Sequence, residues 1–324
     1  MKIIAPIVRA DALAALAEAG ADELFGGVFD PEWEQLYGSA IEYNRRGCYG
    51  KRANISDWAE LERILRLCNE LGLRFSLTMN ALRFSQRQLP ALRRIMERYR
   101  DIGGTDIIVS EPLLCTLARE YKFKTTLSSC AGCISQETAA FYAELGCDGI
   151  IFPRDMSLDE MEELKNAVPQ LSYEAFLMYS GCRYNDGSCR ALHNTPFREL
   201  CQFCDTGDWF YQRRDGKPMS AEDTEYTNQC GSNYARYLKN ACGQCALYRL
   251  KGIAERVKVL ERAGSTERLL KAVRLTRQNL DISEFCRTEA EYLESMLRPE
   301  QVVCAADCYY PDSFLKIKEQ SHEQ

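Results

Sequence analysis

The stretch DIGGTDIIVS, residues 101–110, ends a helical segment with glycine and continues directly into an apolar run. Glycine commonly ends a helix because it adopts the left-handed conformation at little cost. The β-branched residues that follow are typical of a strand buried on both faces, as in a parallel sheet. The same order recurs in EAGADELFGGV (18–28), ELGLRFSLTMNA (70–81), ELGCDGIIF (144–152) and RLKGIAERVKVL (249–260).

This recurrence predicts eight strands, with helical periodicity between most of them. Alternation of strand and helix over about 260 residues favours a TIM-like (β/α)8 barrel of the α/β class. A doubly wound open sheet is the alternative, but the segment after the first strand, PIVRADA, has no glycine-rich phosphate loop. The predicted strands are 2–8, 22–28, 73–80, 106–110, 123–128, 149–152, 172–178 and 256–260.

Residues 181–245 interrupt the alternation and hold seven cysteines together with many polar residues. We expect them to form an insertion after the seventh strand, at the end of the barrel where βα loops emerge. The barrel unit would then cover residues 1–281 and include the insertion, and 282–324 would form a helical C-terminal tail.

The net charge and the lengths of the apolar stretches argue against a nucleic-acid-coating, secreted or membrane protein. The net charge of −6 and the isoelectric point near 5.3 argue against a protein that coats nucleic acid by bulk electrostatics. The apolar run at the N-terminus is too short for a signal peptide, and no stretch approaches the length of a membrane helix. We therefore expect a cytoplasmic protein that does not bind a membrane.

The chain contains 16 cysteines but only two histidines, His193 and His322. Cytosolic thiols stay reduced, so metal binding explains the cluster in the insertion better than disulfides do. Four thiolates suit either an iron–sulphur cluster or a tetrahedral zinc ion, and two C-x2-C pairs are a typical zinc-ribbon spacing. The candidate metal ligands are Cys182, Cys189, Cys201, Cys204, Cys242 and Cys245.

The segment YEAFLMYSGCRYNDGSC, residues 173–189, resembles the signature of the collagenase-like peptidases, the peptidase family of unknown catalytic type numbered 32. Glu174, Phe176, Cys182 and Cys189 keep the offsets of that signature. Further segments, among them GIIFPRDMSLDEMEEL, extend the resemblance over roughly residues 2–281. The chain departs from the family pattern at Met178, where many members have histidine, and in its eighth strand.

The resemblance implies an oxygen-independent hydroxylase that holds a four-iron cluster through cysteines. Its substrates would be tRNA uridine, ribosomal RNA cytidine or a ubiquinone precursor, with prephenate as the oxygen donor. Cys48 is a further possible ligand, because a branch of the family uses a cysteine there. The family label leaves a peptidase as an alternative. A second alternative is a non-catalytic iron–sulphur or zinc protein that acts beside a second family member.

Charged and amide residues near strand ends complete the candidate site. We expect Glu174, Arg46 and Arg52 to have catalytic roles, although Glu174 could equally form a structural ion pair with Lys258 of the neighbouring strand. The fork of arginine suits an anionic substrate, whether RNA or a small molecule. Substrate binding is assigned to Arg9, Asn54 and Asn80.

Overall fold

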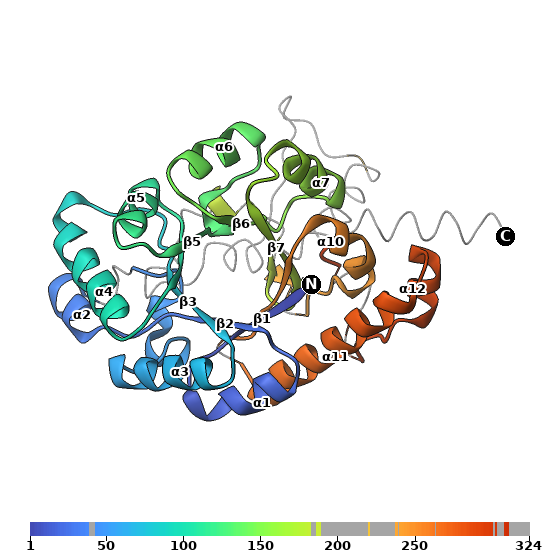
Figure 1. Ribbon diagram of the computed structural model, residues 1–324, viewed down its shortest axis with the longest axis horizontal. Coiled ribbons are helices and arrows are strands. Elements are labelled where there is room, and N and C mark those ends of the chain that lie inside the picture. Colours follow the sequence, from blue (N-terminus) through green and yellow to red (C-terminus); the bar gives the residue numbers. More distant parts are fainter. Residues whose placement is uncertain are drawn as a thin grey trace.

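The computed structural model contains a closed barrel of eight parallel strands encircled by helices (Figure 1). It describes residues 1–38, 43–182, 186–188, 220, 237–238, 240–262, 264–300, 302 and 308–310. All eight predicted strands are confirmed, each within two residues of its predicted bounds. Around the barrel they follow the order β1-β10-β7-β6-β5-β4-β3-β2. Their bounds are β1 Lys2–Pro6, β2 Glu23–Gly26, β3 Arg74–Met79, β4 Asp106–Val109, β5 Lys124–Leu127, β6 Gly149–Ile151, β7 Ser172–Met178 and β10 Arg256–Val259.

The helices pack their apolar faces on the outside of the barrel. In α3 (Trp58–Glu70), Trp58, Leu61 and Cys68 belong to the buried face, and Asp57 caps the helix by accepting the N–H of Glu60. The other helices are α1 Leu13–Glu18, α2 Pro31–Tyr37, α4 Leu89–Asp101, α5 Pro112–Glu120, α6 Gln136–Glu144, α7 Leu158–Ala167, α10 Leu247–Ile253, α11 Thr266–Phe285 and α12 Glu289–Ser295. None of the helices in the described ranges is both long and apolar enough to cross a membrane.

The two ends of the predicted insertion are joined. Strand β8 (Gly181–Cys182) follows β7 closely and pairs antiparallel with β9 (Tyr237–Leu238). Next along the chain, Cys242 forms a backbone bridge to Met178, the last residue of β7. The chain therefore leaves the barrel and returns to it at one place, the C-terminal end of β7.

The described C-terminal residues pack against the barrel. Helix α11 continues past residue 281 to Phe285, and Tyr292 of α12 is fully buried with its hydroxyl donating to the Gln244 carbonyl at 2.7 Å. Residues 308–310 return to the mouth of the barrel. There Cys308 forms a backbone bridge to Cys242, and the Tyr310 hydroxyl donates to the Phe176 carbonyl of β7.

We expect the Tyr310→Phe variant to lose about 1–2 kcal/mol of unfolding free energy, because the buried Phe176 carbonyl loses its hydroxyl partner. Urea unfolding measures this loss. The control is Tyr121→Phe, whose hydroxyl reaches Glu97 in an exposed position and should matter much less. Equal stability of the two variants would mean that residues 308–310 do not stabilise the barrel.

Candidate active site

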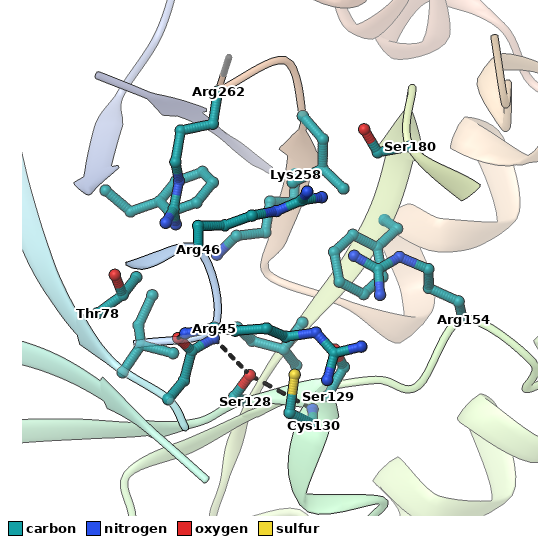
Figure 2. A pocket seen from close by; sticks show the side chains of 16 residues that line it. Arg45, Arg46, Thr78, Ser128, Ser129, Cys130, Arg154, Ser180, Lys258 and Arg262 are labelled. Carbon is teal, nitrogen blue, oxygen red and sulfur yellow. Dashed lines mark hydrogen bonds between the residues drawn. The ribbon is translucent and has the colours of Figure 1, made fainter. Parts of the chain in front are cut away.

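A cavity of about 80 Å³ opens at the C-terminal end of the barrel (Figure 2). Its walls come from the last residues of the strands and from the loops that follow them, which is where barrel enzymes carry their active sites. The lining residues are Phe25, Arg45, Arg46, Thr78, Asn80, Ile108, Ser128, Ser129, Cys130, Ile151, Arg154, Phe176, Ser180, Lys258, Leu260 and Arg262.

Five of these side chains are cationic: Arg45, Arg46, Arg154, Lys258 and Arg262. The lining formed by the described residues includes neither a carboxylate nor an imidazole. Two acidic residues, Asp186 and Glu174, pair with the lining cations Arg154 and Lys258 but do not line the cavity themselves. Positive charge therefore exceeds negative charge around the cavity, as a site for an anionic ligand requires.

Asp186 joins the start of the insertion to the cavity wall. Its carboxylate is 1% exposed, accepts the Ser129 hydroxyl at 2.8 Å and forms ion pairs with Arg154 and, at 3.7 Å, with Arg45. Burial opposes the charged form of Arg154, but Asp186, together with other nearby groups, raises the pKa of this guanidinium. Arg154 also lies over the Phe176 ring at 4.1 Å, so an aromatic ring and a carboxylate together fix its orientation.

Lys258 and Glu174 form the buried ion pair that the sequence suggested. Lys258 Nζ lies 3.0 Å from Glu174 Oε2, and both residues are at most 3% exposed. Arg256 Nε approaches the other Glu174 oxygen at 3.4 Å. Burial lowers the pKa of Lys258, and Glu174 offsets only part of that effect. Lys258 lines the cavity, so Glu174 acts on the site through this lysine.

Arg262 is the least satisfied cation of the cavity. Its Nη1 atom is buried without a hydrogen-bond partner, and the guanidinium lies 5.0 Å from the Phe25 ring. Burial lowers its pKa, and the nearby Arg46 lowers it further. A buried donor without an acceptor destabilises the protein, and an anion in the cavity would relieve that cost.

Two asparagines fix the loop that carries Arg45 and Arg46. Asn80 accepts the Arg45 backbone N–H at 3.1 Å, and Asn54 donates to the Arg46 carbonyl at 3.0 Å. Gly27 makes room for this arrangement, since a Cβ atom there would lie 2.5 Å from Asn54 Oδ1. The two predicted substrate-binding amides thus hold the loop, and of the two only Asn80 also lines the cavity.

The other predicted site residues separate into two groups. Arg46 lines the cavity, and Glu174 contacts it through Lys258. Arg9 and Arg52 are exposed and are not among the lining residues, and Arg9 pairs with Asp11 instead. Arg9 lies directly before a short 3-10 helix, Ala10–Ala12.

The described candidate ligands lie close to the end of β7. Cys182 is half-buried in β8, Cys242 is bridged to Met178, and Cys245 follows Cys242 by three residues. Just before Cys182, Tyr179 and Ser180 both have positive φ angles of 65° and 52°. Backbone strain of this kind is concentrated at functional sites.

The donor chemistry at this place fits a thiolate-bound metal, because cysteines approach from both ends of the insertion. Cys189, Cys201 and Cys204 lie outside the described residues, as does the side chain of Cys48. Within the part of the chain that the structure describes, no three Cys, His, Asp or Glu side chains form a metal site.

Sequence reasoning did not assign Thr78, Cys130, Arg154 or Arg262 to the site. Each lies within the last residues of its strand or within three residues beyond it, namely β3, β5, β6 and β10. Their positions at the ends of predicted strands could have identified them, because side chains at the C-terminal end of a barrel converge on one site. Arg154 and Arg262 lie in segments that resemble the family, whereas Thr78 and Cys130 belong to no motif identified in the sequence.

The barrel and its cationic cavity place the chain among (β/α)8 proteins with a site at the C-terminal end of the strands. The sequence model of peptidase family U32 matches residues 9–302, and the chain belongs to this family. The structure of the U32 peptidase Mk0906 shares the fold, with a TM-score of 0.51 and 14% identity, over 81% of this chain and 92% of that one.

Curated relatives include two proteins named tRNA hydroxylation protein P. The one from Escherichia coli (strain K12) is 26% identical over 56% of this chain and 41% of its own length. The one from Haemophilus influenzae is 25% identical over 51% of this chain and 36% of its own length. The matched region thus spans less than half of either relative.

Proposed function

We propose that this protein hydroxylates a uridine of tRNA without molecular oxygen and holds a [4Fe–4S] cluster at the mouth of the barrel. The observation that carries the proposal is the cationic cavity, in which Arg262 Nη1 has no hydrogen-bond partner. Ser180 of the cavity lining lies two residues before Cys182, and Cys242 forms a backbone bridge to Met178 at the end of β7. The relatives named for tRNA hydroxylation support RNA over a ubiquinone precursor as the substrate.

The residues of this chain have distinct tasks in that function. Cys182 and Cys242 would hold the cluster together with thiolates of the insertion, and the cluster would supply one-electron chemistry or activate an oxygen donor. Arg154, fixed by Asp186, and Arg262, which has a free donor, would bind an anionic oxygen donor such as prephenate. Lys258, held by Glu174, would add a third positive charge.

The nucleosides of tRNA test the proposed activity. In a strain that lacks this gene, one hydroxylated uridine should disappear from digested tRNA and return when the gene is restored. Mass spectrometry of the nucleosides measures this change. An unchanged nucleoside pattern, with peptide hydrolysis by the purified protein, would favour the peptidase alternative.

Metal analysis tests the cluster separately. Protein purified without oxygen should contain about four irons and four acid-labile sulphides, and the Cys182→Ala variant should lose them together with the visible absorption. Cys68→Ala is the control, because Cys68 is buried in α3, where burial raises its pKa to about 12 and keeps the thiol protonated. Zinc without sulphide in the wild type would contradict the cluster.

A further inference from the structure

Cys130 is a thiol of the cavity that is not among the candidate metal ligands. It lies in the short 3-10 helix Ser129–Ala131 directly after β5, where the Ser128 hydroxyl accepts its backbone N–H at 3.3 Å. The residue is 4% exposed, and its sulfur points into the cavity (Figure 2). The nearby Cys133, by contrast, is fully buried and does not line the cavity.

The charges around Cys130 suit a nucleophilic sulfur. Cys130 shares the cavity lining with Arg45, Arg46, Arg154 and Arg262. Two acidic groups behind the cavity lining, Asp186 and Glu174, are already engaged by Ser129, arginine and lysine side chains. Guanidinium groups stabilise negative charge on sulfur, and the thiolate is the reactive form of cysteine.

Independent features of the cavity indicate a ligand with both hydrogen-bond donors and acceptors. Thr78 is 1% exposed and lines the cavity, yet its hydroxyl has no hydrogen-bond partner. Arg262 Nη1 and Arg154 Nε are buried donors that also lack hydrogen-bond acceptors. A uracil ring offers two carbonyl oxygens and one N–H along its edge, which matches the Thr78 hydroxyl and Arg154 Nε and leaves Arg262 to the anionic oxygen donor. Phe25 and Phe176 add flat apolar surface to the same walls.

We propose that Cys130 is a catalytic nucleophile that adds to carbon 6 of the target uracil. This inference rests on the proposed function. In the step, the sulfur forms a bond to carbon 6, and the electron pair of the ring double bond moves to carbon 5 and the carbonyl at carbon 4. Carbon 5, now electron-rich, takes a proton from water. Loss of a proton from carbon 5 then expels the thiolate and restores the double bond.

This cycle needs neither an oxidant nor a reductant, so it can be measured apart from hydroxylation. The full-length protein, purified without oxygen, would be incubated with a tRNA transcript that contains uridine deuterated at carbon 5. Wild-type protein should wash deuterium out of one uridine. Cys130→Ala should reduce that rate at least 100-fold, whereas the matched Cys133→Ala variant should keep it. Transcripts containing 5-fluorouridine should trap a covalent adduct, which mass spectrometry would place on Cys130.

The outcomes separate the inference from the proposed function. Wild-type protein that hydroxylates tRNA but shows neither exchange nor an adduct would overturn the role of Cys130, as would exchange that persists in Cys130→Ala. Loss of iron in Cys130→Ala would also overturn it, because Cys130 would then act on the metal. Absence of tRNA hydroxylation in the wild type would remove the proposed function and this inference together.

Discussion

The Arg262→Met variant should fold as stably as the wild type, or about 1 kcal/mol more stably, and lose about 100-fold of its tRNA hydroxylation. Removing the guanidinium relieves a buried donor without a hydrogen-bond partner and the repulsion from Arg46. It also removes a contact with the Phe25 ring at 5.0 Å, which is worth about 0.5–1 kcal/mol. The activity falls because the charge that would bind the anionic oxygen donor is lost. Urea unfolding and single-turnover hydroxylation measure the two effects.

Two further variants sharpen this test. Arg262→Lys keeps the positive charge but loses the bidentate hydrogen-bond geometry of the guanidinium, so its activity should lie between those of wild type and Arg262→Met. Arg66→Met, which removes an exposed arginine from α3, should change neither quantity. A destabilised Arg262→Met protein with normal turnover would show that this arginine is structural and would remove the main support for an anion in the cavity.

The positions of the strands were predictable because each one carries its own local signal. In 101–110, the glycine ends one helix and Ile107, Ile108 and Val109 supply a segment buried on both faces. Such signals fix the order of strands and helices along the chain. Eight strands joined by short helical connections have few possible arrangements other than a barrel. The pairing of Lys258 with Glu174 was predictable for the same reason, because it needs only neighbouring strands.

The site was only partly predictable, because side-chain direction depends on local backbone turns that the sequence pattern does not specify. Arg9 and Arg154 both follow strand ends, yet Arg9 turns outward to Asp11, whereas Asp186 draws Arg154 into the cavity. Asn54 has the expected place but uses its amide on the backbone of the arginine loop. Such choices rest on contacts between residues far apart in the sequence, and these contacts appear only in the folded barrel.

The Glu174→Gln variant should lose about 3–5 kcal/mol of unfolding free energy, because it leaves Lys258 and Arg256 buried without their shared carboxylate. Adding Lys258→Met should restore a large part of this loss, since the uncompensated charge is then removed. Urea unfolding of the two single variants and the double variant gives the coupling energy. Glu267→Gln is the control, because its pair with Lys271 lies on the surface, and it should leave stability unchanged.

The same variant should respond to pH in a defined direction. Burial already lowers the pKa of Lys258 in the folded protein below its ordinary value of 10.5, and loss of Glu174 lowers it further. Between the folded pKa and 10.5, the unfolded chain binds more protons than the folded one, so stability rises with pH. Glu174→Gln should therefore recover stability between pH 7 and pH 9 more steeply than the wild type, and the double variant should lose this slope. A slope equal to that of the wild type would mean that the amide of Gln at position 174 still holds Lys258 in its charged form.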